Sequence, residues 1–139
     1  MFELPTGWEF NPPTAPDQSI TGGPESLQFG GPGGEQFGAI SLPASADKTL
    51  ADASTYIRDS IKKKVGVDPE QTEHITLGGA PAELLTYHFT TDGVKAYDLD
   101  AFCVHDDRVY ELSLGDEAGN EEHDRALMLA FIASFEFMR

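Results

Sequence analysis

The protein has 139 residues, of which 40% are hydrophobic and 24% charged, as expected for one folded domain with its own core. Nine basic residues against 24 acidic ones give a formal net charge of −15. This charge repels nucleic-acid phosphates and anionic membrane surfaces, which makes both poor partners. A basic patch on a partner protein, a cation or a halophilic setting suits it better. A solvated surface that keeps the protein soluble would also explain it.

Cys103 is the only cysteine, so the chain cannot form an internal disulfide. The first residues lack the basic region and apolar run of a signal peptide, and no apolar stretch approaches the ~20 residues of a membrane helix. These features predict a soluble, cytoplasmic protein with a single domain over residues 1–139. A soluble domain of a longer anchored protein would have the same features.

The first 43 residues contain no Lys or Arg and many Gly and Pro residues. Three short segments, 7–10, 26–29 and 36–42, have β-like composition, and we expect two or three strands with long connections. The Gly-rich segment 30–34 lacks the Gly-Lys-Ser/Thr of a P-loop, so it is not a phosphate-binding loop.

A helix is predicted to follow, with Asp47 as its N-cap and Gly66 as its end. Three lysines, Lys62 to Lys64, fall in its last turn, where cations complement the helix dipole; an anion site is the alternative. The apolar residues at helical spacing are Leu50, Ala53, Tyr56, Ile57, Ile61 and Val65.

Residues 71–77, 82–90, 95–105 and 108–114 are predicted strands. Asp92-Gly93 and Asp106-Asp107 are tight-turn signals, so the last three strands should be sequential antiparallel neighbours. This register places Tyr87 opposite Asp98 and Phe102 opposite Glu111. A final helix, capped by Asn120, should present Leu127, Ala130, Phe131 and Ser134 on one stripe.

Side chains alternate across a strand, so this register sorts them onto two faces. One face is apolar and predicted to be core: Leu84, Thr86, His88, Tyr97, Leu99, Ala101, Cys103, Tyr110, Leu112 and Leu114. The other mixes carboxylates with aromatic rings: Glu83, Leu85, Tyr87, Phe89, Asp98, Asp100, Phe102, Val104, Val109, Glu111 and Ser113. This mixed face is either partly covered by another element or a contact surface.

No catalytic motif is recognisable. The histidines, His74, His88, His105 and His123, have no metal-ligand spacing, so we expect no structural metal and no cofactor; the turn at His105-Asp106-Asp107 could bind a cation weakly. Cys103 has no cationic neighbour and should be buried and unreactive. The carboxylates Glu83, Asp98, Asp100 and Glu111 should lie within reach of one another, but a flat sheet face does not supply the concave pocket that catalysis requires.

Several segments resemble those of PsbP-like domains. Leu4-Pro5-Thr6-Gly7-Trp8 is similar to their Pro-x-Gly-Trp opening, and residues 75–82 followed by Tyr87 to their central Leu-Gly-Gly-x-Pro-Ala segment with its later Tyr. Residues 107–112 and 133–135 resemble a further strand and a closing Ser-Phe. The resemblance implies an α+β fold, with an antiparallel sheet flanked by helices in an α/β/α sandwich. It also implies binding or adaptor functions rather than enzymatic ones.

We therefore predict a small acidic, non-enzymatic binding or adaptor protein whose protein partner carries a basic patch. The predicted binding surface comprises Trp8, Tyr87, Phe89, Asp98, Asp100, Phe102 and Glu111. The alternative, also implied by the resemblance, is an Eag-like secretion chaperone that shelters apolar segments of a client. Against it, Trp8 is not followed by the Asp-Arg-Thr run associated with those chaperones. An enzyme that uses the sheet-face carboxylates is a third reading.

Overall fold

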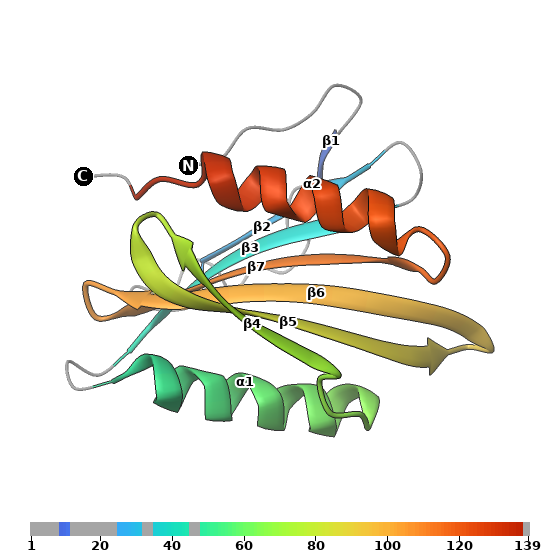
Figure 1. The fold of residues 1–139 in the computed structure, drawn as a ribbon, viewed down its shortest axis with the longest axis horizontal. Coiled ribbons are helices and arrows are strands. Elements are labelled where there is room, and N and C mark those ends of the chain that lie inside the picture. Colours follow the sequence, from blue (N-terminus) through green and yellow to red (C-terminus); the bar gives the residue numbers. More distant parts are fainter. Residues whose placement is uncertain (1–8, 12–24, 32–34, 45–47, 138–139) are drawn as a thin grey trace.

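The computed structural model describes residues 9–11, 25–31, 35–44 and 48–137. Within these residues, seven strands form one antiparallel sheet, and a helix lies on each of its faces (Figure 1). The strands are β1 (Glu9–Asn11), β2 (Glu25–Gly30), β3 (Gln36–Pro43), β4 (Gln71–Leu77), β5 (Ala80–Thr91), β6 (Val94–His105) and β7 (Arg108–Glu117). The helices are α1 (Leu50–Val65) and α2 (Glu121–Ser134). The predicted α+β sandwich is confirmed.

The strand order is β1-β2-β3-β7-β6-β5-β4. The predicted sequential pairing of β5, β6 and β7 is confirmed, and so is its register: Tyr87 lies opposite Asp98, and Phe102 opposite Glu111. The sequence did not predict that β3 pairs with β7, which places the N-terminal strands beside the last strand. No helix among the described residues is long and apolar enough to cross a membrane.

Both predicted tight turns have the left-handed backbone that short hairpins require. Asp92 and Gly93 have φ of 51° and 78°, and Asp106 and Asp107 have φ of 48° and 61°. Positive φ at both central positions matches the twist of the flanking strands, which is why short polar residues and glycine occur there. These two turns fix which side chains of β5, β6 and β7 share a face.

The structure corrects the start of α1. Its N-cap is Thr49, whose hydroxyl accepts a hydrogen bond from the Asp52 amide while the Asp52 carboxylate accepts one from the Thr49 amide. This capping box satisfies two amides at once, which a cap at Asp47 would not do; Asp47 itself lies outside the described residues. The end of α1 is confirmed at Gly66, whose left-handed backbone closes the helix.

The face that α1 buries differs in part from the predicted stripe. Ala53, Ile57 and Ile61 are buried against the sheet, whereas Tyr56, which belongs to the same set of apolar residues at helical spacing, is 58% exposed. Tyr56 is next to Ile57 in the chain and so is turned about 100° away from it around the helix. Leu85, Tyr87, Phe102 and Val109 form the sheet side of this cluster.

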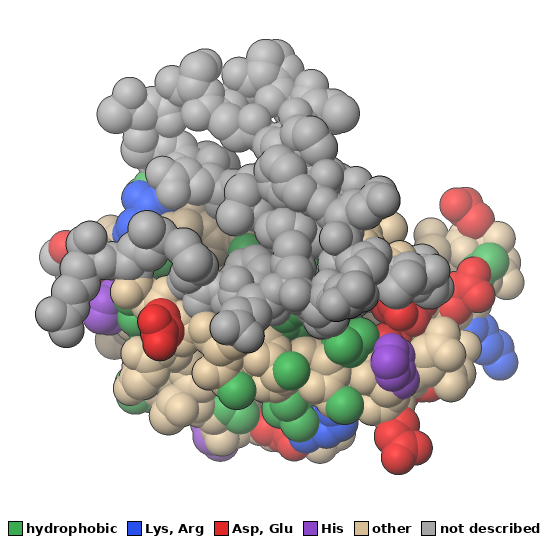
Figure 2. Space-filling model, turned by 90° about the horizontal axis from the view of Figure 1, so that it is seen from above, with side chains coloured by type: hydrophobic (Ala, Val, Ile, Leu, Met, Phe, Trp, Pro, Cys, Tyr) green, Lys and Arg blue, Asp and Glu red, His purple; other side chains and the backbone are tan. Residues whose placement is uncertain are grey.

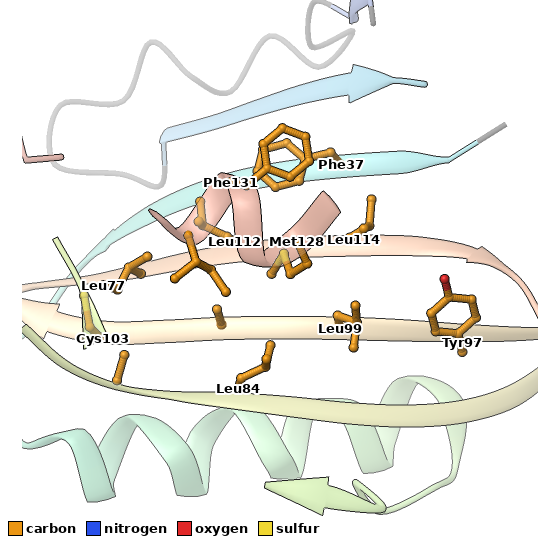
Figure 3. Close-up of a cluster of buried hydrophobic side chains, with 13 residues drawn as sticks. Phe37, Leu77, Leu84, Tyr97, Leu99, Cys103, Leu112, Leu114, Met128 and Phe131 are labelled. Atoms are coloured by element: carbon orange, nitrogen blue, oxygen red, sulfur yellow. The ribbon is translucent and has the colours of Figure 1, made fainter. Parts of the chain in front are cut away.

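The second cluster lies between the sheet and α2 (Figure 3). Phe131 of α2 stacks on Phe37 of β3 with ring centroids 4.1 Å apart. The stripe of α2 is corrected: Met128, Phe131 and Ile132 are buried, while Ala130 is exposed. Asn120 is the N-cap residue as predicted, but its side chain makes no capping hydrogen bond. Two hydrophobic clusters, one on each face, therefore hold the three layers together.

Candidate binding site

A pocket of about 550 Å³ lies between α1 and the sheet. The apolar part of its lining consists of Ile40, Leu42, Ile57, Ile61 and Val65, with the ring of Tyr56. The polar part consists of Ser60, Lys64, Tyr87, Asp98, Asp100, Glu111 and Ser113. Helix α1 packs mainly on β5 and β6. It therefore leaves part of β7 and β3 uncovered on this face, and the pocket opens there. The expectation that this face is too flat to hold a pocket was wrong.

Strand geometry brings the three carboxylates of the pocket together. Asp98 and Asp100 are two residues apart on β6, so both point to the face covered by α1. Glu111 on the neighbouring β7 points to the same face and lines the same pocket. Asp100 is only 4% exposed. The pocket therefore holds three carboxylates in a setting that is largely shielded from water.

Burial raises the pKa of all three carboxylates. The pKa of Asp98 rises to about 6, although the hydrogen bond from Tyr87 opposes the rise. The pKa of Asp100 lies well above its ordinary value, mainly through burial and then through repulsion by Glu111 and Asp98. Burial and the charge of Asp98 also raise the pKa of Glu111. Each carboxylate would be stabilised by a positive charge in the pocket.

Lys64 is the cation that lines the pocket, and its charge lowers the pKa of Asp100 and Glu111. Its position in the last turn of α1 also complements the helix dipole. Within the part of the chain that the structure describes, however, no ion pair within 4.0 Å joins it to a pocket carboxylate. One exposed lysine and three carboxylates line the pocket, so acidic groups outnumber basic ones there.

The predicted binding residues do not form one open surface: some line the pocket, and others are buried under α1. Phe102 is 0% exposed and Tyr87 is also buried, so α1 covers both rings and they do not form an open docking face. Phe89 packs at the edge of the same cluster. Trp8 lies outside the described residues. Tyr87, Asp98, Asp100 and Glu111 all line the pocket, so a partner that enters the pocket can reach them.

Glu83 does not join the other carboxylates, which corrects the prediction of a group of four. Its Oε1 accepts a hydrogen bond of 2.8 Å from the Ser54 hydroxyl and lies 3.5 Å from the Arg58 guanidinium. Arg58 also donates to Ser54 and to Thr72. The Glu83 carboxylate therefore ties α1 to the sheet and is not available to a ligand in the pocket.

The other predicted residues have structural partners. Cys103 is buried as predicted, and burial raises the pKa of its thiol to about 12; its lack of reactivity stays a prediction. His88 is half exposed rather than in the core, and both ring nitrogens have carboxylate partners, Glu70 at 2.8 Å and Glu121 at 3.1 Å. His105 lies 3.2 Å from Asp106 and stacks on Phe137.

A larger hollow of about 1010 Å³ lies on the α2 side, beside the last described residues. Its aromatic lining is engaged internally, because Phe137 stacks on His105 at 3.8 Å and meets Tyr110 edge to face at 4.9 Å. Its carboxylates, Asp106 and Glu136, are exposed. Desolvated ionisable groups mark functional sites more often than solvated ones, so the α1 pocket is the stronger candidate.

Sequence reasoning placed Tyr87, Asp98, Asp100 and Glu111 on one face, as the register confirms, but it placed neither Lys64 nor the apolar wall beside them. The wall comes from β3 and α1, whose placement on this face depends on the β3–β7 pairing. No local motif encodes that pairing. The alternation of residues 36–42 could have indicated which β3 side chains share a face, but not which face of the sheet they join.

The sequence matches no protein-family profile and no curated protein. Its structure is similar to that of cyanobacterial PsbP from Synechocystis sp. PCC 6803, with a TM-score of 0.72 and 17% identity over 99% of this chain and 85% of that one. A Pseudomonas aeruginosa protein of unknown function, PA94, described as a putative regulator, has a TM-score of 0.68 and 16% identity over 95% and 99% of the two chains.

LpqN of Mycobacterium tuberculosis, described as involved in cell envelope biogenesis, has a TM-score of 0.65 and 13% identity over 100% of this chain and 83% of that one. Identities this low establish a common fold and leave function open. The layers, the antiparallel sheet and these similarities together show that the protein has the PsbP-like fold.

Proposed function

We propose that the protein is a non-enzymatic binding protein whose α1 pocket receives a cationic group, the side chain of a lysine or arginine on a protein partner. The observation that carries the proposal is the gathering of Asp98, Asp100 and Glu111 in one shielded pocket. Burial raises the pKa of each, so each would gain from an incoming positive charge.

The shape of the lining suits such a side chain. Lysine and arginine pair a charged head with a methylene stem that packs on apolar surface. Leu42, Ile57 and Ile61 provide an aliphatic wall, and the carboxylates lie on the sheet side of the pocket. Charge-assisted hydrogen bonds from an ammonium or guanidinium group to carboxylates are roughly twice as strong as neutral ones.

The direction of the pKa shifts favours binding over acid–base catalysis. Catalytic carboxylate pairs work because their environments push their pKa values apart, so that one is an acid while the other is a base. Here burial raises the pKa of Asp98, Asp100 and Glu111 alike. All three shifts run in the direction that an incoming cation would offset, and none of the three carboxylates has a lowered pKa that would mark it as a dedicated base.

The overall charge supports the same class of partner. A net charge of −15 attracts a basic surface over long range and accelerates its encounter with the protein. Figure 2 shows acidic side chains gathered toward the end of the molecule where the β5–β6 turn and the start of α2 lie. Binding through these charges should weaken as salt concentration rises.

The described surface gives less support to a chaperone for apolar segments. Its exposed large hydrophobic side chains are Tyr56 on α1, Val94 at the β5–β6 turn and Leu129 on α2. Tyr56 and Leu129 belong to helices on opposite faces of the sheet. A client-binding surface requires a contiguous apolar patch, which these three residues do not form.

The proposal is tested by partner capture from native lysate with a matched pair of double variants. Asp100→Asn/Glu111→Gln removes two charges from the pocket with little change of shape. Asp59→Asn/Glu117→Gln removes two charges from exposed positions on α1 and at the end of β7. We expect the first variant, but not the second, to lose the partner that the wild type captures. Equal capture by both variants would contradict the proposal.

A further inference from the structure

Asp124 is a fully buried carboxylate on the first turn of α2. Its Oδ2 accepts a hydrogen bond from the hydroxyl of Tyr97, a β6 side chain on the same face of the sheet as α2. Its Oδ1 is buried as well and has no hydrogen-bond partner among the described residues. A buried charged oxygen without a partner is costly, so this position calls for a positive charge or a donor.

The neighbouring side chains increase the negative charge around Asp124. Asp116 lies within side-chain hydrogen-bond reach of Asp124, and the charges of Asp116 and Glu35 also act on it; a carboxylate can donate a hydrogen bond only when it is protonated. Among the described residues, no Lys or Arg forms an ion pair with Asp124 or Asp116. The helix N-terminus offers a partial positive charge only.

His123 and Glu35 complete a group with the composition of a metal site. Each of Glu35, His123 and Asp124 offers one ligand atom, and these three atoms lie within 4.8 Å of one another. Nε2 of His123 is 3.9 Å from Oε1 of Glu35. Glu35 is buried, whereas the His123 side chain is 68% exposed. The group therefore has two shielded carboxylates and one imidazole at the solvent side, through which an ion could enter.

We propose that Glu35, His123 and Asp124 bind one divalent transition-metal ion of the Zn²⁺ class. The donor set of one imidazole nitrogen and two carboxylate oxygens suits Zn²⁺ better than Mg²⁺ or Ca²⁺, which prefer oxygen ligands alone. Three protein ligands leave at least one coordination position for water or for a partner's side chain. Bound there, the ion neutralises the buried carboxylates and joins α2 to the segment that leads into β3.

This site differs from the structural zinc that the sequence argues against. Glu35 and His123 are 88 positions apart, so no spacing motif could reveal the site. The α2 side of the sheet also has its own hydrophobic cluster, which includes Phe37, Met128 and Phe131. The protein should therefore fold without the ion and be further stabilised by it, as expected for a ligand that binds only the folded state.

Isothermal titration calorimetry with Zn²⁺ at pH 7.5 tests the proposal. The wild type is compared with two histidine variants. His123→Ala removes the exposed ligand and should fold normally. His74→Ala removes an exposed histidine on β4 that lies outside the group. We expect wild type and His74→Ala to bind one equivalent of Zn²⁺. His123→Ala should bind at least about tenfold more weakly, since loss of even a group that supports a ligand costs about 10- to 100-fold in metal affinity.

A second measurement locates the ion. Co²⁺ added to isotopically labelled protein should broaden the resonances of His123 and Tyr97 before those of His74. Saturating Zn²⁺ should raise the melting temperature of the wild type and of the control variant His74→Ala, but not that of His123→Ala. Equal zinc affinity in wild type and His123→Ala, or broadening that begins at another histidine, would overturn the proposal.

Discussion

The Tyr87 hydroxyl donates a hydrogen bond of 2.9 Å to Oδ2 of Asp98, the residue directly opposite it in the β5–β6 pair. This bond holds the Asp98 carboxylate against Tyr87 in the wall of the pocket. It also favours the charged form of Asp98 and so opposes the effect of burial on the pKa of that carboxylate. Burial and the charges of Asp100 and Asp98 raise the pKa of Tyr87, which keeps the phenol protonated as the donor.

Replacing Tyr87 with Phe removes this donor and keeps the ring. The pKa of Asp98 should then rise above its value of about 6, because the group that favours its ionised form is gone. The free energy of unfolding should fall by about 1 kcal/mol at neutral pH. Carboxyl-carbon NMR titration and urea unfolding measure the two effects. The control is Tyr56→Phe, on a tyrosine that is largely exposed; an unchanged Asp98 pKa in Tyr87→Phe would contradict the account.

Asp98 should make the stability of the protein depend on pH. Because its pKa is raised in the folded state from 3.8 to about 6, its favourable contribution is fully present below about pH 4 and is lost as pH rises through 6. Asn at this position keeps the shape but cannot ionise. We expect Asp98→Asn to be more stable than the wild type by about 3 kcal/mol at pH 7.5, with the difference shrinking toward pH 4. Urea unfolding between pH 4 and pH 7.5 measures this difference. If the difference in unfolding free energy between Asp98→Asn and the wild type did not change with pH, the account would be contradicted.

Gly115 leaves room for the Asp98 carboxylate. The two residues are cross-strand neighbours in the β6–β7 pair, and a Cβ at Gly115 would overlap with Oδ1 of Asp98. Gly115→Ala should therefore destabilise the protein by about 1 to 3 kcal/mol, as overpacking typically does. In a double-mutant cycle, Asp98→Ala should recover most of that loss. Purely additive effects would show that the two side chains do not compete for the same space.

His88 links β5 to the segment before β4 and to the start of α2 through its two carboxylate partners. The hydrogen bond to Glu70 is the main reason that the pKa of His88 is raised. Its stabilisation is therefore fully present below the ordinary histidine pKa of 6.5 and is lost as pH rises through the higher value of the folded state.

The expected result is that His88→Ala loses more stability relative to the wild type at pH 6 than at pH 8.5. His74→Ala, at an exposed histidine on β4, is the control for the loss of an imidazole elsewhere in the protein. Thermal melts at the two pH values measure both variants. A larger loss at pH 8.5 than at pH 6 in His88→Ala would contradict the account.

The sheet centre could be predicted from sequence because its information is local. Two turn signals fix the pairing of β5, β6 and β7, and strand alternation then determines which side chains share a face. This reasoning alone predicts that Cys103 and Leu112 lie on the buried face, and both are buried. The same reasoning placed Asp98, Asp100 and Glu111 together.

What the sequence could not determine depended on contacts between distant segments. The coverage of Phe102 by α1 and the hollow beside that helix follow from how α1 lies on the twisted sheet. The pairing of β3 with β7 brings Ile40 and Leu42 to the pocket, and it places Glu35 near the start of α2. Neither the residue propensities nor the motifs of β3 and β7 specify that these two strands pair.

The most direct test of the proposed function is an NMR titration of the labelled protein with N-acetyl-arginine amide at pH 7.5 and low salt. The probe carries the guanidinium group and stem that the pocket should receive. The account predicts saturable shifts centred on Asp98, Asp100 and Glu111, kept in Asp59→Asn/Glu117→Gln and lost in Asp100→Asn/Glu111→Gln. Binding should weaken at pH 5, where more of the pocket carboxylates are protonated. Shifts confined to exposed acidic residues, or the same shifts in both double variants, would contradict it.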